Sequence, residues 1–287
     1  MSKRRRGTVA LACAALLAAL AVPQAASASD AGSITKSSGA VAATLAWQGP
    51  TGKYGYGVTH PHLTITRAGA VAFDMEITDV CGVGCELVED TPEFADYSIL
   101  KVADLDGDGE PEVLVDTFTG GAHCCTITRF YSYRPATGTY TRDPSYNWLD
   151  TGYKLVDLDG DGKPELSGFD PSFAYAFSSY AGSQFPPLVF SFRRDVTTGK
   201  GSPTDVTRHF PELIKPHAAR MLRAIRKAKK DGTYEIQGTI AAYAADEYLL
   251  GKGSVARAEL SRDRAKGVTR KGFTTDLLKF LKHLGYR

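Results

Sequence analysis

Hydrophobic and polar residues follow two different periods along this chain of 287 residues. Between residues 41 and 207, short runs rich in Val, Ile, Tyr and Phe alternate with Gly, Pro and Asp, a pattern typical of β-strands joined by turns. Eight strands are predicted, at Ala42–Trp47, His62–Thr66, Ala70–Ile77, Ile99–Val102, Val113–Phe118, Thr126–Tyr133, Tyr153–Val156 and Leu188–Phe192. Residues 29–40 are small and polar, and we expect a flexible start there.

After residue 207 the period changes to that of amphipathic helices. One helix is predicted from Pro211 to Lys230, because its apolar residues share one face and Gly232 follows as a stop. Pro216 is expected in the first turn of that helix, where proline is tolerated. Three more helices are predicted, at Ile240–Leu250, from a cap at Ser254 to Gly267, and at Thr275–Leu284. The fold class is therefore α+β, with a β-rich domain at 29–207 and a small α-helical domain at 208–287.

The sequence Asp-Leu-Asp-Gly-Asp-Gly-x-Pro-Glu occurs twice, at Asp104–Glu112 and at Asp157–Glu165. Its closely spaced carboxylates converge on one hard cation if the loop folds back, and Ca²⁺ suits such oxygen ligands in flexible geometry. Gly109 and Gly162 allow the sharp turn that this needs. The predicted ligands of two calcium ions are the carboxylates of Asp104, Asp106, Asp108, Glu112, Asp157, Asp159, Asp161 and Glu165 and the backbone carbonyls of Glu110 and Lys163. The alternative is a pair of solvated acidic turns, which the duplication disfavours.

The two loops are not EF-hands, because Val115 and Gly168 stand where an EF-hand needs a bidentate Glu. They resemble the FG-GAP or VCBS repeat, the calcium-binding blade motif of integrin α-chain propellers and of many secreted bacterial proteins. That resemblance covers residues 95–205 and implies a calcium-stiffened turn between two strands of a blade. A third unit without a metal loop is indicated near residues 63–69. We expect an incomplete propeller or open sheets, because so few units do not close a ring.

The first 28 residues read as a secretory signal peptide, with a basic start at Lys3–Arg6, an apolar stretch and the cleavage site Ala26-Ser27-Ala28. This predicts a secreted, extracellular protein with no integral membrane segment after cleavage. Four cysteines remain, and an even number in an oxidising compartment predicts two disulfides of open connectivity. These cysteines are Cys81, Cys85, Cys124 and Cys125. A zinc site that includes His123 is the alternative.

The net charge of +2 hides two regions of opposite sign. Residues 29–207 carry 12 basic and 24 acidic side chains, whereas residues 208–287 carry 18 basic and 8 acidic ones. The basic run Arg220–Lys230 is interpreted first as a solvated face or as a contact with the acidic region. Its alternative partners are an anionic cell-wall polymer, a polysaccharide or a protein. Nucleic acid is not an expected partner.

These features together predict a secreted calcium-binding structural or interaction protein without a catalytic site of its own. The motifs G-x-S-x-G and H-E-x-x-H and a phosphate-binding glycine loop do not occur in the sequence. The alternative is a secreted hydrolase that acts on cell-wall polymer or polysaccharide and uses calcium as a scaffold. Its acid and base would be carboxylates such as Asp116, Asp150 or Asp170.

Overall fold

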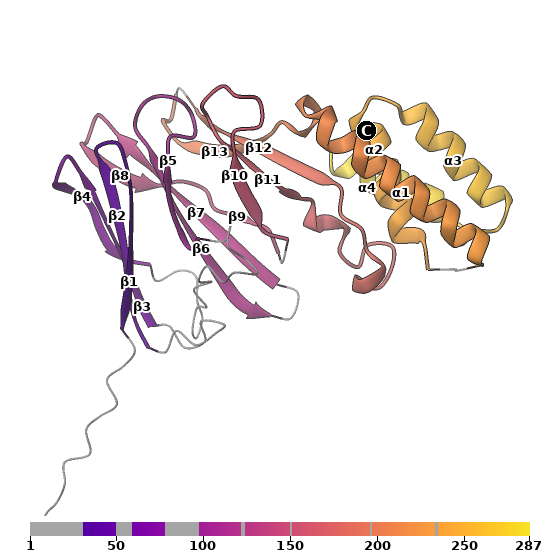
Figure 1. Ribbon diagram of the computed structural model, residues 1–287, viewed down its shortest axis with the longest axis horizontal. Coiled ribbons are helices and arrows are strands. Elements are labelled where there is room, and N and C mark those ends of the chain that lie inside the picture. Colours follow the sequence, from indigo (N-terminus) through magenta and orange to yellow (C-terminus); the bar gives the residue numbers. More distant parts are fainter. Residues whose placement is uncertain are drawn as a thin grey trace, which may run out of the picture.

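The structure is a computed structural model that describes residues 31–49, 59–77, 98–121, 124–149, 151–195, 197–232 and 235–287. The signal peptide, Cys81, Cys85, His123 and Asp150 lie outside the described residues, so the disulfide and zinc predictions stay predictions. Three antiparallel sheets follow one another along the molecule, and four α-helices lie beyond the third sheet (Figure 1). This confirms the α+β class.

In the described residues the first and third sheets contain four strands each and the second contains five, and four strands of every sheet pair with one another in chain order. The first sheet consists of β1 (Gly32–Ser38), β2 (Val41–Gln48), β3 (Thr59–Arg67) and β4 (Ala70–Glu76). The second consists of β5 (Leu100–Ala103), β6 (Glu112–Gly121), β7 (Cys124–Arg134) and β8 (Thr139–Arg142), with β9 (Tyr146–Asn147) also paired to β7. The third consists of β10 (Tyr153–Val156), β11 (Glu165–Phe169), β12 (Pro187–Arg194) and β13 (Gly201–Asp205).

Alternating burial explains why these segments form stacked sheets. Along β2, Val41, Ala43, Leu45 and Trp47 are buried, while the residues between them are only half-buried. Successive strand residues point to opposite faces, so one apolar face per strand is enough to hold a sheet against its neighbour. These side chains pack with apolar residues of β5, β6 and β7 in one core between the first and second sheets.

A second core joins the second sheet to the third, and Trp148 lies at its centre. Its ring is fully buried, stacks on Tyr153 at 4.8 Å between centroids and meets Phe190 edge-on at 5.6 Å. Its indole N–H donates to the hydroxyl of Thr128 at 3.0 Å, which satisfies the buried polar atom. The second and third sheets are therefore fixed against each other.

The helical part contains α1 (Pro211–Asp231), α2 (Gln237–Leu249), α3 (Gly253–Ala265) and α4 (Phe273–His283). Helix α2 is its centre, because every residue from Ile240 to Leu249 is buried. The connection between β11 and β12 joins the same core: Phe173 and Phe177 both meet Phe280 edge-on at 5.1 Å. None of the helices in the described part of the chain is long and apolar enough to cross a membrane.

The eight predicted strands and four predicted helices are all confirmed, with changes at their ends. Three expectations are wrong. Residues 32–38 form β1, because they complete the backbone hydrogen bonds of β2. Pro216 lies inside α1, which begins at Pro211, and Ser254 lies within α3, which begins at Gly253 without a side-chain cap. The sheets follow each other in an open row in the described residues, and no propeller is shown.

Candidate metal centre

The two acidic loops occupy equivalent places in neighbouring sheets. The first loop, residues 104–112, joins β5 to β6, and the second loop, residues 157–165, joins β10 to β11. Their glycines adopt matching left-handed conformations, with φ of 77° and 84° at Gly107 and Gly109 and of 78° and 84° at Gly160 and Gly162. The expected sharp turns are confirmed, and only glycine adopts them without strain.

The first and last carboxylates hold the two loops in the same shape. Asp104 accepts the N–H groups of Gly107 at 2.8 Å and Gly109 at 2.9 Å, and Asp157 accepts those of Gly160 at 2.8 Å and Gly162 at 3.0 Å. At the far end of the loops, Glu112 accepts the N–H of Leu105 at 3.0 Å and Glu165 that of Leu158 at 2.9 Å. The repeated sequence therefore folds into the same backbone conformation in both loops.

Each loop brings three carboxylates close enough for one ion. One oxygen each of Asp104, Asp106 and Asp108 lies within 4.8 Å of the others, and the same holds for Asp157, Asp159 and Glu165. A carboxylate oxygen that already accepts one N–H keeps a second lone pair, so these contacts leave room for a cation. The donor sets fit a hard ion such as Ca²⁺, which prefers carboxylate and carbonyl oxygen.

The side chains at the seventh loop position, Glu110 and Lys163, form ion pairs and do not join the three clustered carboxylates. Glu110 forms a bidentate ion pair with Arg67 of β3, in the first sheet, with Arg67 Nε at 2.7 Å from its Oε2. Hydrogen bonds from Arg67 lower the pKa of Glu110. In the second loop, Lys163 pairs with Asp161 and thereby lowers the pKa of that carboxyl group. At this position the expected calcium ligands are therefore the backbone carbonyls of Glu110 and Lys163 and not their side chains.

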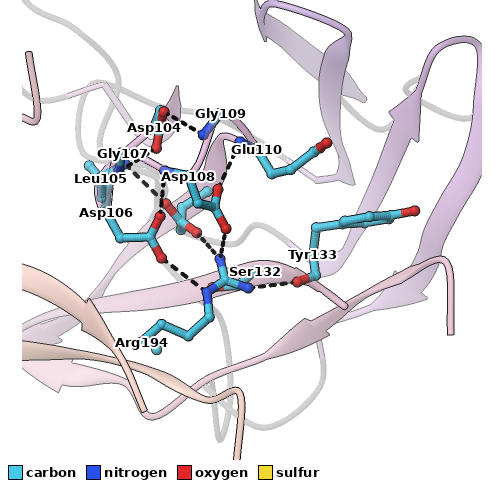
Figure 2. Close-up of polar contacts among 12 residues, drawn as sticks. Asp104, Leu105, Asp106, Gly107, Asp108, Gly109, Glu110, Ser132, Tyr133 and Arg194 are labelled. Carbon is cyan, nitrogen blue, oxygen red and sulfur yellow. Dashed lines mark hydrogen bonds and ion pairs between the residues drawn. The ribbon is translucent and has the colours of Figure 1, made fainter. Parts of the chain in front are cut away.

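Arg194 makes the two loops different. Its guanidinium reaches the first loop from the end of β12, and its Nε donates to Asp106 at 3.0 Å (Figure 2). Its Nη2 donates to Glu112 at 3.0 Å and lies 3.2 Å from Asp108, while its Nη1 donates to the carbonyl of Tyr133 at 2.8 Å. A side chain of the third sheet thus places a positive charge among three carboxylates of the second sheet.

The carboxylates of the second loop have no comparable partner. Asp157, Asp159 and Glu165 form no ion pair with any cation of the described chain, and the two aspartates are exposed. Burial raises the pKa of Glu165. In the first loop, burial and the charge of Asp106 raise the pKa of Glu112 to about 8, although the Leu105 N–H and Arg194 oppose this shift. The negative charge of the first loop is therefore partly compensated by Arg194, whereas the three clustered carboxylates of the second loop have no such cation among the described residues.

The two loops share one cleft of about 470 Å³ between the second and third sheets. Asp106 and Asp108 line it from the first loop and Asp159 and Glu165 from the second, together with Arg194. A Cβ atom added to Gly107 would lie 2.7 Å from Cδ of Lys163, so the loops touch each other. The two acidic clusters remain separate groups, as the sequence predicts, and residues of both line this one cleft.

The carboxylates considered for a hydrolase have structural partners. Asp116 lies on β6, where it pairs with Lys101 at 2.5 Å and accepts the hydroxyl of Tyr153 at 3.1 Å. Asp170 accepts the N–H of Ser172 at 2.9 Å and the hydroxyl of Tyr286 at 2.8 Å. Both are buried at 6% and 7% exposure, so they do not form a solvent-open pair.

Comparison with known proteins gives partial matches. No family model matches the chain, and no solved structure matches it. A probable thylakoid lumen protein of Synechocystis is 31% identical over 160 residues, which cover 54% of this chain and 44% of that protein. An uncharacterized protein of Sinorhizobium fredii is 29% identical over 133 residues, which cover 45% of this chain and 19% of that protein. The chain therefore spans less than half the length of the curated relatives it matches.

Proposed function

We propose that this chain is a calcium-stabilised structural or interaction protein that works outside the cytoplasm. The observation that carries the proposal is the convergence of three carboxylates in each of two loops that meet in one cleft. The similarity to a probable thylakoid lumen protein supports a compartment outside the cytoplasm. Secretion through a signal peptide belongs to the same proposal.

The second loop is the preferred calcium site in this proposal. Its ligands are the carboxylates of Asp157, Asp159 and Glu165, joined by Asp161 and by the carbonyl of Lys163. The first loop offers the same donors, but there an incoming ion has to displace or share the oxygens that Arg194 holds. The two equal sites expected from the sequence thus become one open site and one that is restrained by arginine.

The proposed role of the ion is mechanical. Binding to the folded loops alone stabilises the fold by about 2.7 kcal/mol when free calcium is a hundred times Kd. Because the loops lie where the second and third sheets meet, this stabilisation reaches the junction as well as the turns. A rigid row of sheets then presents its surface to a partner.

The repeated four-stranded meanders support a relationship to FG-GAP or VCBS blades. Both loops occupy the turn between the first two strands of their meander, as that resemblance implies. The first sheet is a third meander, and its β3–β4 turn lies at residues 68–69. We propose that these three sheets are blades of an open, incomplete array.

Thermal unfolding with calcium and with a chelator tests the stabilising role. We expect the melting temperature to rise on addition of calcium and to fall back with excess chelator, while magnesium at the same concentration has a smaller effect, because Mg²⁺ demands a tighter octahedral site. A melting temperature that neither calcium nor the chelator changes would contradict the proposal.

A further inference from the structure

A second cleft, of about 590 Å³, lies between the third sheet and helix α1. Strands β10 and β11 supply one wall, and the first half of α1 supplies the other. Its lining contains Lys154, His217, Arg220 and Arg223 and no aspartate or glutamate. It shares no lining residue with the acidic cleft, so the two are separate sites of opposite charge.

The spacing of the helical residues explains why their side chains gather in this cleft. His217, Arg220 and Arg223 lie three residues apart, so they share one side of α1. The adjacent side carries Met221 and Ile225, which are buried in the helical core. With that apolar stripe fixed, the basic stripe has to face the third sheet.

The two arginines have no direct partner among the described residues, although Arg220 interacts electrostatically with the buried Asp246. Arg220 and Arg223 are exposed and form neither a hydrogen bond nor an ion pair with a described residue. By contrast, Lys229 on the same helix pairs with Glu259 at 2.9 Å and with Asp263. Arg220 and Arg223 are i, i+3 neighbours on α1, so their like charges repel each other, and an anion bound by both relieves that repulsion.

A buried pair fixes the back of the cleft. His217 is 6% exposed, and its Nδ1 lies 2.7 Å from Oδ2 of the fully buried Asp246. No described residue bonds to the other ring nitrogen, Nε2, which leaves that atom available to a ligand. The ring of Phe169 lies 6.3 Å from that of His217 and is 43% exposed, so it adds an apolar lip.

We propose that this cleft binds a small organic phosphate, with Arg220 and Arg223 on the phosphate oxygens and Phe169 against the carbon skeleton. Arginine is suited to phosphate because its planar fork donates two parallel hydrogen bonds. Lys154 of β10 also lines the cleft, and Asp246 holds the imidazole of His217 in place. The volume exceeds what an inorganic ion needs and falls in the range of small-molecule sites.

NMR titration of the full protein with inorganic phosphate and with phenyl phosphate tests this proposal. Phenyl phosphate should bind more tightly, with amide shifts at residues 151–154, 167–169 and 216–223. The variant Arg220→Ala/Arg223→Ala should bind it about tenfold more weakly or worse, because two charge-assisted contacts are lost. All of these changes should persist in excess chelator, since the site does not involve the calcium loops.

The charge-matched control is Arg226→Ala/Lys230→Ala, which removes two exposed cations of the same helix outside the cleft. We expect its affinity for phenyl phosphate to stay within about twofold of the parent's. An equal loss in both variants would mean attraction by net charge alone and would overturn the proposal. So would retention of the protein on phosphatidylglycerol vesicles without binding of phenyl phosphate, because the ligand would then be a membrane surface.

Discussion

The two acidic loops have almost the same sequence and the same backbone, yet they meet different surroundings. The first loop receives Arg194 from the third sheet and has Glu110 tied to Arg67 of the first sheet. The second loop has only Lys163, which belongs to the loop itself. A repeated motif therefore determines the shape of a turn, whereas the neighbouring sheets determine how much of its charge is left for an ion.

This difference has a physical cause in the stacking of the sheets. The first loop lies beside the next sheet in the row, whose β12 ends in Arg194 at the height of the loop. A guanidinium carries one charge and a calcium ion carries two, and both seek the same carboxylate oxygens. Our central claim is that the second loop binds calcium more tightly than the first because Arg194 competes only at the first.

Removal of Arg194 should have the largest effect. Without calcium, Arg194→Ala should lower the free energy of unfolding by about 3 kcal/mol, because Asp106, Glu112 and the carbonyl of Tyr133 all lose the hydrogen bonds that this guanidinium donates. Denaturant unfolding measures this loss. Added calcium should recover more stability in the variant than in the parent, since an ion can take the position that the guanidinium leaves.

The matched control is Arg193→Ala, which removes an exposed arginine next to Arg194 on the same strand. We expect its free energy of unfolding to lie within about 0.5 kcal/mol of the parent's. Equal effects of the two substitutions would contradict the role given to Arg194.

Removal of one carboxylate from either loop, in two separate variants, tests which loop binds calcium more tightly. Asp159→Ala should abolish most of the calcium-dependent rise in melting temperature, a loss of about 2.7 kcal/mol when calcium is a hundred times Kd. Asp106→Ala should keep most of that rise, because its loop contributes little to calcium binding. Thermal unfolding with and without calcium measures the calcium-dependent rise in melting temperature of each variant. The reverse order would assign the stronger site to the first loop.

The glycines offer a test in which the two loops should behave alike. Gly109→Ala and Gly162→Ala should each destabilise the protein by about 1 kcal/mol, because alanine is strained at a φ of 84°. Nothing lies within 4 Å of the added Cβ in either loop, so backbone strain is the whole effect. Clearly different losses in denaturant unfolding would show that the two turns are not equivalent.

The smallest effect is expected at Lys163. Its ammonium pairs with Asp161 on the surface, and such pairs contribute little to stability. Lys163→Ala should therefore leave the melting temperature of the calcium-free protein nearly unchanged. Its calcium affinity should rise modestly, because a positive charge next to the site is gone. A fall in affinity, measured by titration, would mean that Lys163 orders the ligands instead of repelling the ion.

Local patterns explain what the sequence predicted correctly. The alternation in β2, the apolar face of α1 and the left-handed glycines of the loops all depend on residues close in the chain. Strand β1 was missed because Gly32–Ser38 has no apolar face and exists through its pairing with β2. Strand β13 likewise depends on β12.

The cleft between the loops and the partners of the carboxylates were not predictable in this way. Arg194 lies 82 residues after Glu112, and no local pattern marks it as a partner. The pairing of His217 with Asp246 similarly joins two helices. Contacts of this kind arise when sheets and helices pack together, and that packing cannot be predicted from a single sequence.

Calorimetric titration of the protein with calcium, compared with Arg194→Ala, tests the central claim most directly. We predict one ion per chain for the parent at low calcium, lost in Asp159→Ala, and a second ion of similar affinity in Arg194→Ala. Two equal sites in the parent protein, or a single site that survives Asp159→Ala, would contradict it.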